Sequence, residues 1–310
     1  MKNIFLFLFL IFCYPFILQA QTEMDLQTMT GTIYGTLQFP REYKPVPVVL
    51  IIAGSGPTDR NGNNPQMQNN SLKMLADSLQ SHGIATLRYD KRGIAASKDA
   101  GPEEAELRFD TYIEDACAWV RKLRMDSRFS KVIIAGHSEG SLIGMVSATK
   151  EHADGFISIA GAGRSADLIL KEQLASQPEP VKLACYSTID SLVAGKTVSE
   201  VSPMLYSLFR PSVQPYLISW FKFDPQKEIN KLTIPVLILQ GSTDLQVTTN
   251  DAILLSKSAI GSKLLIIEGM NHVLKNSSNM QQENIATYSD PKLPINSELV
   301  KNITLFLLGF

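Results

Sequence analysis

This sequence contains few cysteines and few histidines, and its net charge is close to zero. Its 310 residues include 3 cysteines and 4 histidines, and no C-x-x-C pair or close cluster of the two residue types occurs. The common metal sites that rest on such spacings are therefore not predicted. Charged residues make up 19% of the chain, and the formal net charge is -1. Since nucleic-acid-binding proteins usually carry a basic face or stripe, we expect no nucleic-acid partner.

Long apolar runs are also absent, except at the N-terminus. Lys2 precedes an almost wholly apolar run at residues 4–18, and Ala20 is small enough for a cleavage site. This pattern predicts a signal peptide over residues 1–20 and export of the mature chain, which would be periplasmic or secreted. The run of about 15 residues is shorter than the ~20 that a spanning helix needs. No later stretch reaches ~18 apolar residues, so we expect no membrane span in the mature chain.

Two cysteines remain after such a cleavage, Cys117 and Cys185. An exported protein could pair them in a disulfide. Cys117 lies in an apparent helix with apolar neighbours, which favours a buried free thiol instead.

Strand and helix patterns alternate along most of the chain. Short apolar segments predict strands at residues 46–53, 84–89, 132–135, 155–160, 234–240 and 264–268. Helices are predicted at residues 71–81, 107–124, 141–150, 251–260 and 297–308. This alternation is typical of a parallel sheet covered on both faces. We therefore predict an α/β domain over residues 21–310, with a doubly wound, mostly parallel sheet, an antiparallel strand pair within residues 26–39 and a helical cap insertion at about 163–225.

One serine lies between two glycines where a predicted strand meets a predicted helix. Gly136-His137-Ser138-Glu139-Gly140 has the G-x-S-x-G pattern of a nucleophile elbow. Such a turn exposes the serine hydroxyl, and small flanking residues let the strand and the helix pass closely. Ser138 is therefore the candidate nucleophile.

A serine nucleophile needs a base, and the position of each histidine narrows the choice. His82 and His152 each precede a predicted strand, which places them at the wrong end of the sheet. His137 lies inside the elbow and cannot easily face the hydroxyl of Ser138. His272 follows the last predicted strand, at the edge where ligands of such sheets bind, and is the candidate base.

The base needs a carboxylate to orient it. Asp244 lies four residues past the predicted strand that ends at Gln240, on a loop at the same edge. Asp251 is a rival, but it falls within a predicted helix. The order Ser138, Asp244, His272 is the one expected of α/β-hydrolases.

Acyl transfer also needs amide donors for the oxyanion. The backbone N–H of Glu139, at the start of the helix after Ser138, is the first candidate. The loop after residues 46–53 reads Gly54-Ser55-Gly56-Pro57, and Ser55 is the second candidate, with Gly56 as the alternative.

These motifs together resemble the α/β-hydrolase superfamily, and above all bacterial serine esterases with a GSGP-x-DRNG oxyanion loop and a GHSEG elbow. The chain carries the first at residues 54–62 and the second at 136–140, while residues 89–93, YDKRG, resemble a turn found in many such hydrolases. Ala95 replaces the second glycine of that turn, and we expect a small backbone adjustment there. The resemblance implies a serine hydrolase that cleaves small carboxylic esters through an acyl-enzyme, with no cofactor and no metal.

Some alternatives stay open at this stage. A peptidase, a thioesterase or a carbohydrate deacetylase would use the same residues, and a non-catalytic binding module could share the fold. Aromatic residues of the insertion, Tyr216, Trp220 and Phe221, could shape an acyl pocket or simply pack the cap. A further set, Asp59, Arg60 and Arg92, could bind a polar substrate group or form a structural ion-pair network. The sequence does not predict the oligomeric state.

Overall fold

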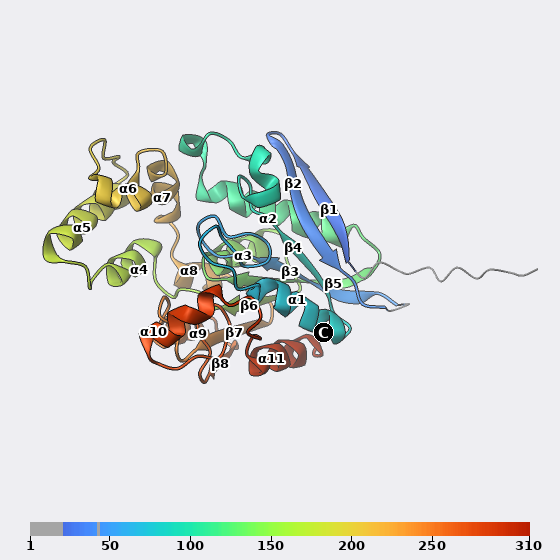
Figure 1. The fold of residues 1–310 in the computed structure, drawn as a ribbon. Helices are drawn as coiled ribbons and strands as arrows, with labels where there is room; N and C mark the ends of the chain where they lie inside the picture. The colour runs from blue at the N-terminus through green and yellow to red at the C-terminus, as the bar shows by residue number, and fades with distance from the viewer. Residues whose placement is uncertain (1–20, 42–43) are drawn as a thin grey trace, which may run out of the picture.

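An eight-stranded sheet forms the centre of the computed structural model, which describes residues 21–41 and 44–310. The predicted signal peptide, residues 1–20, lies outside the described residues. The strand order is β1-β2-β4-β3-β5-β6-β7-β8 (Figure 1). The strands are β1 (Gln21–Thr28), β2 (Gly31–Gln38), β3 (Val46–Ile52), β4 (Ala85–Tyr89), β5 (Phe129–His137), β6 (Gly155–Ile159), β7 (Val236–Gly241) and β8 (Lys263–Ile267).

The sheet is antiparallel at one edge and parallel elsewhere. Strand β2 pairs antiparallel with β1 and with β4, and the six strands from β4 to β8 in the sheet order are mutually parallel. The predicted doubly wound α/β fold with an N-terminal antiparallel pair is confirmed. The prediction placed the start of that pair too late, because β1 begins at Gln21 and its first residues are polar and exposed, without an apolar alternation.

Alternate residues of the central strands pack into two separate cores. Val48, Leu50 and Ile52 of β3 belong to one core, and Val49 and Ile51 belong to the other. A strand buried on both faces has no polar face, which explains the continuous apolar sequence of β3.

Helices cover both faces of the sheet. One core contains apolar residues of α2 (Phe109–Arg124), α3 (Glu139–Lys150) and α9 (Thr249–Ser258), and the other contains those of α1 (Ser71–Ser81) and α11 (Ser297–Leu307). Further turns of 3-10 helix are η1 (Ala95–Ala100), η2 (Glu104–Glu106), η3 (Pro203–Leu205) and η4 (Thr287–Ser289). Of the helices in the described part of the chain, none has both the length and the apolar character needed to cross a bilayer.

Between β6 and β7 the chain forms five α-helices, and the first four of them lie on the side away from β1 and β2 (Figure 1). These four are α4 (Ala166–Gln173), α5 (Glu179–Val193), α6 (Tyr206–Phe209) and α7 (Gln214–Trp220). Helix α7 packs on α2, where Trp220 stacks on Phe109 with 5.8 Å between ring centroids. Helix α8 (Pro225–Asn230), which follows, packs on α3 and α9.

Two local features bear on the sequence predictions. Cys117 and Cys185 are both free and buried, as predicted for Cys117, and burial raises the pKa of the Cys117 thiol to about 11. Ala95 has φ of 45°, so it keeps the left-handed conformation that favours the glycine it replaces.

Candidate active site

The turn at Ser138 joins β5 to α3 in a strained conformation. Ser138 has φ of 54° and ψ of -121°, which few residues other than glycine adopt. A Cβ on Gly136 would lie 2.1 Å from the carbonyl oxygen of Gly140, and one on Gly140 would lie 2.3 Å from that of Ile52. Only glycine fits at either position. The close packing of strand and helix that these glycines allow holds Ser138 in its strained conformation.

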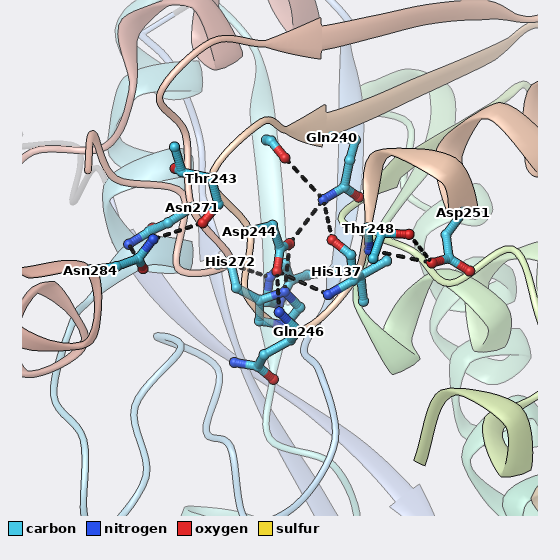
Figure 2. Close-up of polar contacts among 12 residues, drawn as sticks. His137, Gln240, Thr243, Asp244, Gln246, Thr248, Asp251, Asn271, His272 and Asn284 are labelled. Atoms are coloured by element: carbon cyan, nitrogen blue, oxygen red, sulfur yellow. Dashed lines mark hydrogen bonds and ion pairs between the residues drawn. The ribbon is translucent and has the colours of Figure 1, made fainter. Parts of the chain in front are cut away.

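Asp244 and His272 meet in the loops that follow β7 and β8. His272 Nδ1 lies 2.8 Å from Asp244 Oδ2, and both side chains are buried. Figure 2 shows the carboxylate between His272 and Gln240, whose Nε2 donates to Asp244 Oδ2 at 2.9 Å. The backbone N–H groups of Gln246 and Val247 donate to Asp244 Oδ1 at 2.7 and 3.0 Å.

These contacts determine the charge state of Asp244. Burial by itself raises the pKa of the carboxyl, but the charge and hydrogen bond of His272, with the amides of Val247 and Gln246, outweigh it and hold the pKa below its usual value. An ionised carboxylate only accepts hydrogen bonds, so His272 Nδ1 carries the proton. In the neutral form of the His272 ring this proton stays on Nδ1, and Nε2 can then accept a proton.

His137 lies against His272, and its ring binds the backbone of that residue. Its Nε2 lies 2.8 Å from the backbone oxygen of His272, and the two rings are 4.9 Å apart between centroids. Since a carbonyl only accepts, Nε2 of His137 is the donor. Burial, and to a smaller extent the electrostatic effect of the adjacent His272, lowers the pKa of His137 to about 4. His137 is therefore a neutral support for the backbone of His272.

Ser138 and His272 line the same small cavity. It measures about 150 Å³, and Gly54 and Ser55 also line it. A Cβ on Gly54 would lie 3.2 Å from Cβ of Ser138, which shows how closely the loop after β3 approaches the serine.

A larger cavity of about 580 Å³ opens beside Ser138. Ser55, Gly56 and Glu139 line it next to the serine. Apolar residues of the helices between β6 and β7 also line it, namely Ile169, Leu170, Phe209, Leu217 and Trp220, beside polar residues of the same segment such as Gln173 and Arg210. The residues predicted to supply the two amide donors, Glu139 with either Ser55 or Gly56, therefore line one cavity.

The aromatic residues of the insertion pack on the core, and two of them also face this cavity. Tyr216 and Trp220 line the larger cavity, whereas Phe221 belongs to the core and does not line it. The hydroxyl of Tyr216 donates to Glu139 Oε2 at 2.8 Å.

Four other sequence candidates have structural partners. Asp251 accepts hydrogen bonds from Arg164 at 2.8 and 2.9 Å and from Thr248 at the start of α9, so its carboxylate is not the partner of His272. Arg60 pairs with Asp90 at 3.0 Å, and the Arg92 guanidinium pairs with Asp115. Asp59 accepts from the amides of Asn61 and Asn63 in its own loop.

Sequence reasoning missed two residues that hold the site together. Gln240, the last but one residue of β7, binds Asp244 and also donates to the backbone oxygen of Val247 at 2.9 Å. Lys91, just after β4, donates to the backbone oxygen of Gly54 at 2.6 Å and to Glu139 Oε1 at 2.8 Å. A polar residue at the carboxyl end of a buried strand is the signal that could have indicated both residues, although it does not indicate their partners.

In the described ranges 21–41 and 44–310, no three His, Cys, Asp or Glu side chains gather as a metal site would require.

Comparison with solved structures identifies the fold. Est1E from Butyrivibrio proteoclasticus, solved with ferulic acid bound, superposes with a TM-score of 0.64 and 19% identity over 93% of this chain and 100% of that one. The α/β hydrolase GrgF from a Penicillium species superposes with a TM-score of 0.59 and 18% identity, over 93% and 97% of the two chains. The chain has the α/β-hydrolase fold.

Within this α/β-hydrolase fold, sequence comparison adds two relationships. A family model described as "Serine aminopeptidase, S33" matches residues 68–204. Esterase EstD of Thermotoga maritima is 29% identical over 265 residues, which are 81% of this chain. The chain spans about 60% of the length of that curated relative.

Proposed function

We propose that this protein is a serine hydrolase that cleaves small carboxylic esters through an acyl-enzyme. The observation that carries the proposal is the buried contact of His272 with Asp244, together with the cavity that His272 and Ser138 both line. The esterase name of the Thermotoga relative supports esters as the substrate class.

In the proposed reaction Ser138 Oγ attacks the acyl carbon while His272 Nε2 takes the hydroxyl proton. Asp244 holds the ring of His272 with Nδ1 protonated and stabilises the imidazolium that forms. The backbone N–H groups of Ser55 and Glu139 bind the oxyanion. The imidazolium then protonates the leaving alcohol, and water, activated by the same ring, releases the acid and restores Ser138.

Amide cleavage is the second candidate, because the matching family model is described as a serine aminopeptidase. An aminopeptidase must recognise a positively charged amino terminus, which calls for a free carboxylate near the serine. Glu139 is the sole acid among the described residues that line the larger cavity, and it is already paired with Lys91. This pairing favours an uncharged acyl group and hence an ester.

We further propose that residues 1–20 direct export and that residues 163–225 form a cap over the larger cavity. Helices α4, α6 and α7 contribute lining residues to that cavity, which supports a role of the cap in acyl-group selection.

Labelling and hydrolysis test the proposal directly. The purified chain from residue 21 onward is incubated with a fluorophosphonate probe and with p-nitrophenyl esters of several acyl lengths. We expect labelling at Ser138 and ester hydrolysis, with neither in Ser138→Ala. Parallel assays on aminoacyl-anilides, an acyl thioester and an acetylated sugar identify the preferred leaving group. An unlabelled serine and no turnover of any acyl length would refute the hydrolase assignment.

A further inference from the structure

A buried ion pair joins the residue that follows Ser138 to the loop after β4. Lys91 Nζ contacts Glu139 Oε1 at 2.8 Å, and the two side chains are 1% and 2% exposed. The same ammonium group donates to the carbonyl oxygen of Gly54 at 2.6 Å. One cation is thus shared by the oxyanion loop after β3 and the first residue of α3.

The contact with Gly54 constrains the next amide. The carbonyl of Gly54 and the N–H of Ser55 belong to one peptide unit, and no cis peptide occurs among the described residues. In a trans peptide the carbonyl and the N–H point in opposite directions. By holding the carbonyl, Lys91 fixes the plane of the unit and turns the N–H of Ser55 to the side away from itself.

Glu139 completes the link to the second donor. Its backbone N–H, at the start of α3, is the other proposed oxyanion donor, and its side chain holds Lys91. We propose that Lys91 and Glu139 form a positioning pair that orients both oxyanion donors, Ser55 N–H and Glu139 N–H, as one unit. The inference rests on the hydrolase function proposed above and adds two side chains that do not touch the reacting atoms.

Helix α7 contacts this pair from the cap side. Tyr216 OH donates to Glu139 Oε2 at 2.8 Å. On the other side of the pair, Lys91 Nζ lies 5.0 Å from the ring centroid of Tyr112, which belongs to α2. Burial, followed by the charge of Glu139, raises the pKa of Tyr216 well above its usual value, so the hydroxyl stays a donor. The position of α7 is therefore transmitted to the oxyanion donors through one carboxylate.

The test removes the pair without leaving a buried charge. In Lys91→Met/Glu139→Gln we expect kcat for a p-nitrophenyl ester to fall about 100-fold, the scale of one lost oxyanion donor, with KM nearly unchanged. The affinity for an alkyl boronic acid, which mimics the tetrahedral intermediate, should fall by a similar factor. The matched control is Arg92→Met/Asp115→Asn, which removes another buried pair outside the proposed machinery and should keep kcat.

The outcomes separate this inference from the proposed function. A wild type that labels and turns over, with a double variant whose kcat and boronate affinity stay within about threefold, overturns the positioning role. A wild type that is inert refutes the hydrolase function and this inference with it. If the double variant does not fold, Tyr216→Phe decides: it keeps the ion pair, and we expect kcat and boronate affinity to fall together several-fold at constant KM. Unchanged values in that variant also overturn the proposal.

Discussion

His272 Nδ1 donates to Asp244 Oδ2 across 2.8 Å, although the two residues come from loops after different strands. The carboxylate also accepts from Gln240 and from two backbone amides, so four donors share its two oxygens. A carboxylate held this way determines both the orientation and the tautomer of the imidazole.

Replacing the acid should therefore damage turnover far more than folding. In Asp244→Asn the amide can present an N–H to the ring and favour the wrong tautomer, and we expect kcat to fall by ~10⁴. Steady-state kinetics on a p-nitrophenyl ester measure the loss. Asp251→Asn is the matched control, since Asp251 is also a buried aspartate but pairs with Arg164. A variant Asp244→Asn with near-normal kcat would assign the acid to another residue.

Gln240 offers a second test of how the acid is supported. Gln240→Leu keeps the volume but removes the donor to Asp244 and leaves the oxygen of Val247 without it. We expect kcat to fall about tenfold, the equivalent of ~1.5 kcal/mol for a hydrogen bond to a charged group. Gln240→Glu should be worse, because it places a second carboxylate beside Asp244. Equal kcat in Gln240→Leu and wild type would show that the backbone amides alone hold the acid.

The buried neutral His137 should make stability depend on pH. Its pKa is lowered to about 4 in the folded protein, against 6.5 when unfolded. As pH falls from 6.5 to 4, only the unfolded chain takes up this proton, so the free energy of unfolding falls by up to about 3 kcal/mol. His137→Gln removes this contribution. Urea unfolding at pH 7 and pH 4 should therefore show a smaller loss in the variant, and an equal loss would contradict the prediction.

Ala95 is strained where glycine would not be. At this φ of 45°, alanine is less stable than glycine by on the order of 1 kcal/mol. The extra backbone entropy that glycine loses on folding offsets part of this difference. We expect Ala95→Gly to raise the free energy of unfolding by up to about 1 kcal/mol with kcat unchanged. Ala96→Gly, next to it, serves as the control and should not stabilise. Thermal unfolding of both variants makes the comparison, and a destabilised Ala95→Gly would refute the strain argument.

The sheet and the candidate triad were predictable because their signals are local. Ser138, Asp244 and His272 each follow an apolar strand within a few residues, and the topology of parallel strands brings such positions to one edge. The short helix α10 (Gln281–Ala286) was not predicted, because its sequence QQENIA has no apolar stripe.

The supporting contacts were not predictable for a different reason. Lys91 and Glu139 are 48 positions apart, and nothing near Lys91 in the sequence shows that its ammonium group is buried against a carboxylate. The same holds for Tyr216 and Glu139, which are 77 positions apart. Such pairings depend on how α3 and α7 pack, and periodicity within either helix carries no information about that.

The long sequence separation between the parts of the site also determines when they can meet during synthesis. His137 and His272 touch although 135 positions separate them, and β7 and β8 must join the sheet before that contact forms. A growing chain therefore carries Ser138 long before it has made His272, the proposed base. Because pairing of parallel strands so distant in sequence is slow, the proposed mechanism implies that the nascent protein is inactive until its last third has folded.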